Sequence, residues 1–437
     1  MTDATLDALV ARMALTVPAG WVFGLERMTR LLARLGDPHR ALPPTIHVAG
    51  TNGKGSTTAT LRALLEAAGR TVHVFTSPHL VRFNERIRVA GRLADDAMLI
   101  DAIGRAETAN AGEPITFFEL TTAAAFLLFA EHPADACLLE VGLGGRLDAT
   151  NVIPAPRVSV VTSISLDHEK FLGSTLAAIA AEKAGIVKPD RPVVAAPQAD
   201  EVADVLERAA ARARAPLFLG GRDWTTTLED GRLVHRSERG LLDLAPPRLL
   251  GPHQIVNTGT ALAALEAAGW EFPEETLARG LAVVDWPARM QRLASGPLVA
   301  HAPAGAELWL DGGHNPGAGA VIAATLAALD RRAPRPLHLV LGMLETKDPL
   351  GFLAPFAGSI ATLSTVPVAG DGHPGRDPEA LAQMVADGLR LPAKAHATVA
   401  AALEAIPKTG EPPPRILICG SLHLAGEVLR ENGPWPA

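Results

Sequence analysis

Apolar positions along the chain follow two spacings, one typical of buried strands and one typical of helices. Residues 45–49 form a continuous apolar run, and Leu61, Leu64, Leu65 and Ala68 then recur at the spacing of a single helical face. The same succession continues along the chain, with further strands expected at 71–75, 137–141, 158–164 and 192–196. Strands that alternate with helices predict a parallel sheet covered by helices on both faces.

The hydrophobic pattern changes twice beyond residue 215. From about 216 to 250 the apolar segments are short and separated by turns, which predicts a small edge sheet. A new alternation of strands and helices follows residues 285–291, with strands expected at 307–310, 337–341, 360–366 and 415–419. We therefore predict an N-terminal α/β domain over residues 1–290 and a C-terminal α/β domain over residues 291–437, with a cleft between them.

Composition and charge restrict the class of protein. The 437 residues are 48% hydrophobic and 20% charged, which is typical of soluble globular proteins, and the net charge of −7 argues against a nucleic-acid-binding surface. Cys137 and Cys419 are too few for a disulfide framework and are expected to be buried in strands. The N-terminus lacks the pattern of a signal peptide, and no apolar run approaches the roughly 20 residues of a membrane helix. A cytoplasmic protein is expected.

The first strand leads into a glycine-rich turn, Gly50-Thr51-Asn52-Gly53-Lys54-Gly55-Ser56-Thr57. Loop amides and a helix N-terminus can bind phosphate oxygens, and Lys54 adds a positive charge. The usual P-loop has four residues between its first glycine and its Gly-Lys pair, whereas here only two intervene, and Gly55 separates the lysine from the hydroxyl residue. We interpret the turn as a shortened nucleotide-binding loop, against the alternative of a chance glycine-rich turn.

Polar side chains occur at or after the ends of several predicted strands, namely Ser77, Glu140, Asp167 and His168. Because ligands gather at the carboxyl ends of parallel strands, we expect these side chains to converge on the phosphate loop. Glu140 is a candidate metal ligand or general base, and pairing with Arg146 is the structural alternative. Carboxylate, imidazole and hydroxyl groups are suitable ligands for a divalent cation that bridges phosphates.

Composition alone gives structural interpretations to three other polar residues. Lys183 is expected to be a solvated charge, and Gln254 and Asn257 are expected to cap the alanine-rich helix that follows them.

Taken in order, the motifs resemble the folate branch of the Mur ligase superfamily, the dihydrofolate synthases and folylpolyglutamate synthases. The matching segments span nearly the whole chain: 50–56, Ser77-Pro78-His79-Leu80-Val81-Arg82, 140–151, Ser165-Leu166-Asp167-His168, 182–186, Arg289-Met290-Gln291, Asp311 with His314-Asn315-Pro316, and Gly420-Ser421. Each motif alone is weakly specific, but eight in order are strong.

The resemblance implies an N-terminal P-loop ATPase domain with a parallel sheet and a C-terminal Rossmann-like domain for glutamate ligation. It also implies an ATP-dependent amide ligase in which ATP phosphorylates a substrate carboxylate and the amine of L-glutamate attacks the acyl phosphate. Phosphorylation is needed because a free carboxylate would have to expel oxide.

The resemblance also implies roles for single residues. ATP would be bound by Thr51, Asn52, Gly53, Lys54, Gly55 and Ser56, with further contacts from Asn257, Arg289 and Asp311, Arg289 reaching the phosphates across the domain junction. Mg²⁺ would be bound by Ser77, Glu140 and His168. Lys183 matches a carbamylated (N6-carboxylated) lysine, and the catalytic groups would be Lys54, Lys183 and His314. Glutamate would be bound by His314 and Ser421.

The substrate-binding residues are implied in the same way. The positions that match a dihydropteroate pocket are Val22, Phe23, Arg82, Thr116, Phe118, Leu147, Asp148 and Ala149, with Asp148 expected to hydrogen-bond the pterin. They favour a bifunctional enzyme that acts on 7,8-dihydropteroate and on reduced folates, over one restricted to polyglutamylation.

The sequence departs from the family pattern at three positions. Ala288 replaces a frequent glycine, Gly313 replaces a frequent alanine, and His423 replaces a frequent aromatic residue. The first two exchanges are between small residues and are expected to have little effect, whereas His423 is expected to alter local packing.

Two rival functions fit the sequence less well. A cell-wall Mur ligase would need an extra N-terminal domain, and the phosphate loop already begins at Gly50. A P-loop NTPase regulator would leave the motifs at 311–316 and 420–421 without a role. We expect a monomer that binds small-molecule substrates and neither nucleic acid nor membranes.

Overall fold

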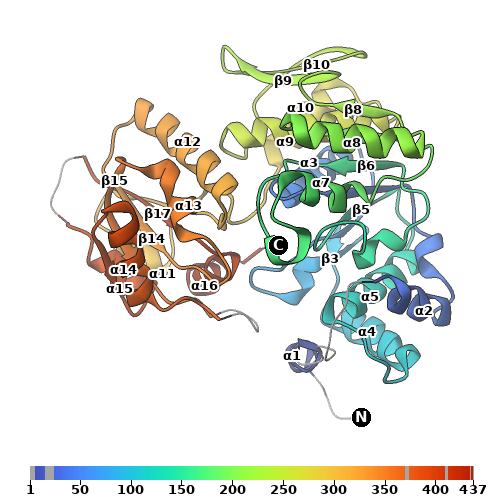
Figure 1. Ribbon diagram of the computed structural model, residues 1–437, viewed down its shortest axis with the longest axis horizontal. Coiled ribbons are helices and arrows are strands. Elements are labelled where there is room, and N and C mark those ends of the chain that lie inside the picture. Colours follow the sequence, from blue (N-terminus) through green and yellow to red (C-terminus); the bar gives the residue numbers. More distant parts are fainter. Residues whose placement is uncertain (1–4, 15–23, 370–373, 409–411, 434, 437) are drawn as a thin grey trace. The chain divides into compact units, whose positions relative to one another are not determined.

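The computed structural model describes residues 5–14, 24–369, 374–408, 412–433 and 435–436. The chain divides into two compact units (Figure 1). The first comprises Met1–Arg248 and His253–Asp285, and the second comprises Leu249–Pro252 and Trp286–Ala437. Each unit combines a mainly parallel sheet with helices, which confirms the predicted α/β fold class.

The first unit is built on an eight-stranded sheet of order β4-β3-β2-β5-β1-β6-β7-β8. All pairings from β2 to β8 are parallel, and β3 pairs antiparallel with β2 and with β4. The strands are β1 (Thr45–Ala49), β2 (Val72–Phe75), β3 (Ile87–Val89), β4 (Arg92–Leu93), β5 (Ala136–Glu140), β6 (Val158–Val161), β7 (Val193–Ala195) and β8 (Leu217–Leu219).

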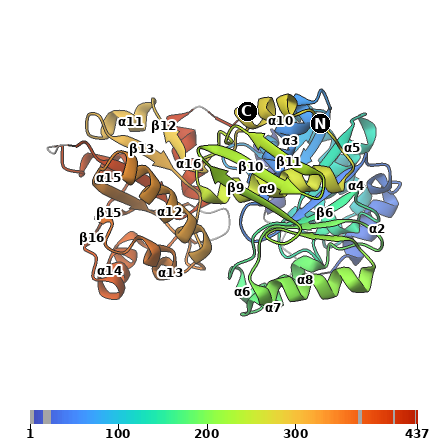
Figure 2. The ribbon, with the colours of Figure 1, turned by 90° about the horizontal axis from the view of Figure 1, so that it is seen from above.

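Both faces of this sheet are covered by helices, as Figure 2 shows for α8 on one side and α10 on the other. One face packs against α3 (Lys54–Ala67), α9 (Pro252–Ala267) and α10 (Glu274–Val283). The other face packs against α1 (Leu6–Ala14), α2 (Glu26–Arg34), α4 (Asp96–Asn110), α5 (Phe117–Glu131), α7 (Leu176–Ala184) and α8 (Asp200–Ala213). Short helical segments are η1 (Pro38–Arg40), η2 (Phe83–Arg86), η3 (Ala149–Val152) and α6 (Glu169–Leu172).

The phosphate loop is anchored by the core on its helical side. Leu61, Leu64 and Leu65 of α3 are fully buried against Ile46 and Val48 of β1. Each such leucine contributes roughly 1.5–3 kcal/mol by leaving water. The predicted strand, turn and helix are therefore confirmed, and the turn between them is fixed at both ends.

The segment from 216 to 250 differs in part from its prediction. The strands β9 (Trp224–Glu229), β10 (Arg232–Ser237) and β11 (Gly240–Leu244) form a separate antiparallel sheet, as expected. Residues 217–219, however, form the edge strand β8 of the main sheet, where Leu219 packs against the cluster of α7 and α8. A three-residue strand carries too little pattern to be assigned to one sheet or the other.

The second unit contains a six-stranded sheet of order β12-β13-β17-β14-β15-β16, parallel except for β12. The strands are β12 (Gln291–Leu293), β13 (Glu307–Leu310), β14 (Leu337–Leu341), β15 (Ile360–Thr365), β16 (Ala393–Ala395) and β17 (Arg415–Cys419). One face packs against α12 (Pro316–Arg332), α13 (Pro349–Leu353), η4 (Ala354–Phe356) and α14 (Pro378–Leu389). The remaining helices are α11 (Pro297–His301), α15 (Val399–Glu404) and α16 (Leu422–Asn432).

Two further expectations concern the interior and the membrane. Cys137 of β5 and Cys419 of β17 are buried free thiols, as predicted. None of the helices in the described part of the chain is both long and apolar enough to span a membrane.

Candidate active site

The phosphate loop joins the end of β1 to α3 through two glycines at which any other residue would be strained and closely contacted. At Gly50 (φ 149°) a Cβ atom would lie 1.8 Å from the hydroxyl of Thr162, and at Gly53 (φ 91°) it would lie 2.4 Å from the amide oxygen of Asn257. The loop is therefore closely packed between two other segments. Lys54, Gly55 and Ser56 form the first turn of α3, whose amides face the helix N-terminus.

Only part of the loop backbone is available to an anion. The amides of Thr51 and Asn52 both donate to the carbonyl oxygen of Ser163, at 2.9 and 3.2 Å. The amide of Thr57 donates to Gly53 O within the helix. The expectation that the whole loop cradles phosphate is thus narrowed to the amides of residues 53–56.

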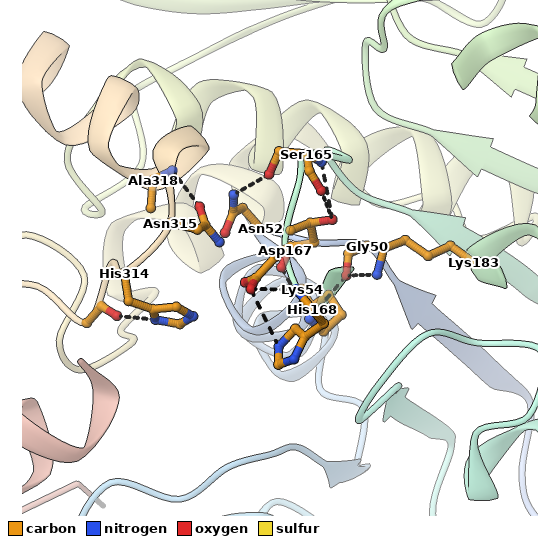
Figure 3. A network of polar contacts seen from close by, with 12 residues as sticks. Gly50, Asn52, Lys54, Ser165, Asp167, His168, Lys183, His314, Asn315 and Ala318 are labelled. Atoms are coloured by element: carbon orange, nitrogen blue, oxygen red, sulfur yellow. Dashed lines mark hydrogen bonds and ion pairs between the residues drawn. The ribbon is translucent and has the colours of Figure 1, made fainter. Parts of the chain in front are cut away.

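Two lysines converge on a single carbonyl of this loop (Figure 3). The Nζ atom of Lys183 donates to Gly50 O at 2.8 Å, and Nζ of Lys54 donates to the same oxygen at 3.2 Å. Lys183 is only 4% exposed. Burial, and then the charge of Lys54, lower the pKa of Lys183 to about 7. The interpretation of Lys183 as a solvated charge was wrong. The residue lies on α7, and its side chain is buried where it contacts the loop that follows β1.

The phosphate loop is joined by side chains to the segment that follows β6. The hydroxyl of Thr51 donates to Ser165 O at 3.0 Å, and the side-chain amide of Asn52 donates to the Ser165 hydroxyl at 3.1 Å. Thr162 completes the contact by donating to Asn52 O at 2.8 Å. No local pattern predicted these contacts, which connect the phosphate loop to the segment that carries Asp167 and His168.

The predicted metal ligands lie beyond neighbouring strands of one sheet. Glu140 ends β5 in register with Val48 of β1, which directs its buried side chain to the α3 face. Ser77 follows β2, and His168 precedes α6 with a left-handed backbone (φ 53°) and an exposed side chain. Among the described residues, no group of three or more His, Cys, Asp and Glu side chains is arranged to hold a metal ion. One buried carboxylate, a hydroxyl and an imidazole nonetheless fit a hard divalent cation chemically.

The structural alternative for Glu140 was a pair with Arg146, and this interpretation was wrong. Arg146 instead pairs with Glu182 of α7, at 2.8 Å between Nη2 and Oε1. Glu182 also accepts the backbone amide of Arg146, at 2.7 Å to its carbonyl oxygen. These contacts hold the second glycine turn against α7, directly beside Lys183.

Asp148 organises the second glycine turn and is at odds with its predicted contact to a pterin. One carboxylate oxygen accepts from the amides of Gly142 and Leu143, each at 3.0 Å, and the other accepts from the amide and hydroxyl of Thr150, at 3.0 and 2.5 Å. Burial raises the pKa of Asp148, and these hydrogen bonds oppose that rise. The four acceptor positions of the carboxylate are filled.

A buried histidine extends this network to the strand before the phosphate loop. His47 of β1 is fully buried and lies 2.8 Å from the Thr150 hydroxyl through Nε2. Burial lowers the pKa of His47 to about 3, so the ring is neutral. Because the Thr150 hydroxyl donates to Asp148, it must accept from His47. Sequence reasoning missed this role, since a histidine inside an apolar run carries no distinctive spacing.

The remaining predicted pterin-site residues lie around the start of α5. Thr116 caps this helix by accepting from the amide of Glu119 at 3.1 Å, as a capping box predicts. Phe118 packs against Phe75 with ring centroids 5.8 Å apart, and it lies where a Cβ of Gly142 would be. Arg82 precedes η2 and lines a hollow of about 540 Å³ with residues 93–97. Leu147 and Ala149 flank Asp148, and Val22 and Phe23 lie outside the described residues.

The expected capping role of Gln254 and Asn257 was wrong. Both lie inside α9, where Asn257 is in the second turn and beyond reach of the first amides. The side-chain amide of Gln254 donates to the Ser56 hydroxyl at 3.3 Å. The side-chain amide of Asn257 donates to Oε1 of Gln254 at 3.0 Å. They form a polar contact between α9 and the first turn of α3, beside the phosphate loop.

In the second unit, Arg289 lies before β12 and Asp311 lies after β13. These two strands pair antiparallel, so the two residues lie at the same end of the sheet. Asp311 is 3% exposed and accepts from the amides of Met290 and Gly313, at 2.8 and 2.7 Å. Burial raises the pKa of Asp311, and the charge of Arg289 opposes this. Ala288 has a left-handed backbone (φ 54°), so the exchange of glycine for alanine is not neutral as expected, because alanine is strained there.

The predicted glutamate-site residues follow β13 and β17. Nδ1 of His314 lies 2.9 Å from Gly312 O, and Asn315 caps α12 by accepting from the amide of Ala318 at 2.9 Å (Figure 3). Ser421 is buried and caps α16, where it accepts from the amide of His423 at 3.1 Å. The carbonyl of Gly313 accepts from the amide of Gly420, which joins the two loops. The second unit thus brings both predicted residues to one end of its sheet.

Two family descriptions match the chain. Residues 48–265 match the Mur ligase middle domain, and residues 289–422 match the Mur ligase glutamate ligase domain.

Individual proteins are similar to the chain over nearly its whole length. It is 36% identical over 408 residues to the dihydrofolate synthase/folylpolyglutamate synthase of Escherichia coli strain K12, an alignment that covers 93% of this chain and 90% of the relative. The structure of E. coli FolC in complex with DHPP and ADP is similar with a TM-score of 0.86 at 33% identity, covering 98% and 97% of the two chains. A bifunctional folylpolyglutamate synthase/dihydrofolate synthase with Mn, AMPPNP and L-glutamate bound gives a TM-score of 0.84 at 31% identity, covering 98% of each chain.

Proposed function

This chain belongs to the Mur ligase family, in the branch of the dihydrofolate synthases/folylpolyglutamate synthases, and from that premise we propose that it is bifunctional. It is an ATP-dependent ligase that forms an amide bond with glutamate. The proposed reactions add L-glutamate first to 7,8-dihydropteroate and later to reduced folates. The alternative is a folylpolyglutamate synthase only, and a P-loop NTPase regulator is a weaker alternative.

The observation that carries the proposal is the gathering of three groups at one edge of the first sheet. The Glu140 carboxylate is in register with Val48, two residues before the phosphate loop, and the Lys183 amine donates to the first carbonyl of that loop. A helix N-terminus can bind phosphate oxygens and a buried carboxylate can hold a divalent cation, which are two parts of a phosphoryl-transfer site, and the buried amine of Lys183 lies beside them.

The proposed reaction has two steps. A carboxylate oxygen of the acceptor attacks the γ-phosphorus of ATP, the bond to the β-phosphate oxygen breaks, and ADP leaves. The neutral amine of glutamate then attacks the acyl carbon, phosphate leaves from the tetrahedral intermediate, and the nitrogen loses a proton. The amides of residues 53–56 and Lys54 would hold the phosphates, and Lys54 would offset the charge that accumulates as the γ-phosphoryl group moves.

A divalent cation is part of this proposal. One similar structure contains Mn, and we propose Mg²⁺ bound by Ser77, Glu140 and His168 in this chain. Such an ion would supply positive charge next to the ATP phosphates and would stabilise the leaving group. Lys183 would be N6-carboxylated, because a lysine with a pKa of about 7 is about half neutral amine at pH 7 and can therefore react with CO₂. The carbamate would convert a buried cation into an oxygen ligand.

The other predicted residues have proposed roles on the same basis. Thr51, Asn52, Asn257, Arg289 and Asp311 would contact the nucleotide, and His314 and Ser421 would bind glutamate. The pteroyl group would contact Arg82, Thr116, Phe118 and the backbone of residues 147–149, with Val22 and Phe23 as further proposed contacts. Residues 1–290 would form the ATP-binding domain and residues 291–437 the glutamate-ligase domain of a cytoplasmic monomer.

The test is a glutamate-incorporation assay with three acceptors. Purified protein, ATP, Mg²⁺ and labelled L-glutamate are offered 7,8-dihydropteroate, tetrahydrofolate or a UDP-muramyl precursor, and ADP and labelled product are both measured. We expect incorporation into the first two acceptors and none into the third. Lys54→Ala should abolish both incorporations together, since one phosphate loop serves both.

The outcomes separate the alternatives. Incorporation into tetrahydrofolate alone would leave a folylpolyglutamate synthase and remove the first activity. ADP release without labelled product from any acceptor would contradict the ligase and favour the NTPase. A wild-type rate with dihydropteroate in the Lys54→Ala variant would contradict the role of the loop.

A further inference from the structure

The turn that carries Arg289 has an unusual backbone. Ala288 and Met290, on either side of Arg289, both adopt left-handed conformations, with φ of 54° and 44°. Both residues are buried, at 0% and 2% exposure. Side chains with a Cβ rarely adopt this conformation, and two in a three-residue turn require that the surroundings hold them there.

Three polar contacts hold the turn in this conformation, each at a different backbone group. The amide of Ala288 donates to Oε1 of Gln291 at 2.9 Å, and the amide of Met290 donates to Oδ2 of Asp311 at 2.8 Å. The carbonyl of Ala288 accepts from the amide of Gly312 at 3.0 Å. Gln291 and Asp311 are therefore the two side chains that fix the direction of the backbone around Arg289.

The guanidinium group of Arg289 depends on that direction. Its Nη1 atom donates to the carbonyl oxygen of Ala288 at 2.8 Å, so the side chain folds back on the strained residue before it. The same Nη1 atom would lie 3.0 Å from a Cβ on Gly312, which shows how closely the guanidinium packs on that backbone. If Ala288 relaxed to a negative φ, its carbonyl would turn away and this anchor would be lost.

We propose that Gln291 and Asp311 are positioning residues that hold the left-handed turn at 288–290 and thereby fix the guanidinium of Arg289 for its ligand. The ligand group would be an anionic phosphate oxygen, because a guanidinium offers several N–H donors in one plane. The inference rests on the proposed contact between Arg289 and ATP. It assigns a new role to Gln291 and a second one to Asp311.

The two positioning residues differ in how cleanly they can be tested. Asp311 is itself a proposed nucleotide contact, so its removal would change two properties at once. Gln291 holds the turn through Oε1, and its side chain makes a contact that a carboxylate oxygen can reproduce. Gln291→Ala removes the acceptor, whereas Gln291→Glu retains an oxygen at the same position. Gln383, an exposed residue of α14 in the same unit, provides a matched control.

The experiment is a double-mutant cycle on the intact chain, with kcat and KM for ATP measured at saturating acceptor and glutamate. We expect Arg289→Ala to lower kcat/KM by about 100-fold, the loss typical of one transition-state donor. Gln291→Ala should lower it between about 10- and 100-fold through misplacement of the guanidinium. Gln291→Glu and Gln383→Ala should remain within about twofold of wild type. When Arg289→Ala is already present, adding Gln291→Ala should have no further effect.

The results distinguish this inference from the proposed function. If Arg289→Ala leaves kcat/KM unchanged, the nucleotide role of Arg289 is wrong and the inference is overturned with it. If Arg289→Ala lowers kcat/KM but Gln291→Ala does not, or if their effects multiply in the double variant, only the inference is overturned. Should Gln291→Ala unfold, the Gln291→Glu variant decides: a loss above tenfold in a folded protein overturns the role of the oxygen acceptor.

Discussion

Replacing Lys183 with methionine should make the protein more stable while making it inactive. The buried amine lies in an environment that lowers its pKa from 10.5 to about 7. Each pH unit of that shift corresponds to about 1.4 kcal/mol, so keeping this lysine in the folded state costs on the order of 5 kcal/mol. Methionine has a similar length and no charge to desolvate.

Two effects reduce the expected gain. The variant loses the hydrogen bond from Nζ to Gly50 O, which is worth about 1 kcal/mol, although Lys54 still donates to that oxygen. Relaxation around a buried charge also makes the real cost smaller than the full shift implies. We therefore expect Lys183→Met to raise the free energy of unfolding by roughly 2–4 kcal/mol at pH 7.

The gain should depend on pH in a defined direction. Below pH 7 the amine is protonated in the folded and the unfolded chain, and the full cost of the folded state is present. Between pH 7 and about 10.5 the unfolded chain binds one proton more than the folded chain, so wild-type stability rises with pH. The advantage of Lys183→Met should therefore shrink by about 1.4 kcal/mol per pH unit above pH 7.

The measurement is urea unfolding followed by circular dichroism at several pH values. Buffers are free of CO₂ and contain a chelator, so that neither a carbamate nor a metal ion stabilises the wild type. Lys170→Met, at an exposed position of α6, is the control and should change stability by less than about 0.5 kcal/mol. A variant no more stable than wild type at pH 6.5, or an advantage that grows with pH, would refute the reasoning.

Three other substitutions test separate parts of the site. Lys54→Ala should abolish ATP binding, measured by calorimetry, but lower the unfolding free energy by less than about 1 kcal/mol, because its amine donates to the loop carbonyls of Gly50 and Thr51; a loss of several kcal/mol in unfolding free energy would contradict this. Asp148→Asn should cost roughly 2–4 kcal/mol in urea unfolding, because an amide nitrogen would face backbone N–H donors, whereas Thr150→Ser should cost less than about 1 kcal/mol. Ala288→Gly should raise the free energy of unfolding by about 0.5–1 kcal/mol, because glycine adopts the left-handed backbone without strain. A lower free energy of unfolding in this variant would show that the turn is not strained.

Most of the fold could be predicted because the core imposes a regular spacing on the sequence. The runs at 45–49, 158–161 and 415–419 lie in parallel strands that are buried on both faces, so they are mainly apolar and easy to recognise. The strands that were missed are short: β3, β12 and β16 have three residues each and β4 has two. Segments of two or three residues are too short to show a hydrophobic period, and β4, β12 and β16 also lie at sheet edges.

The candidate site could be predicted in its residue types but not in its contacts. Glycines, a lysine and strand-end carboxylates are visible in the sequence because their order along the chain is fixed. The burial of Lys183 depends on where α7 meets the end of β1, which no local pattern encodes. The same holds for Asp148, whose four donors lie in two segments of a folded turn, and for the left-handed backbone of Ala288.

The hydrogen bonds between residues 50–52 and 162–165 have a consequence for protein engineering. Thr51 and Asn52 share Ser163 and Ser165 as partners, and Thr162 occupies the space that any side chain at Gly50 would need. A chimaera that takes only one of these segments from a relative would combine a loop and a partner that were selected separately. Transplanting both together should preserve folding, so the two segments are best regarded as a single exchangeable cassette although more than 100 residues separate them.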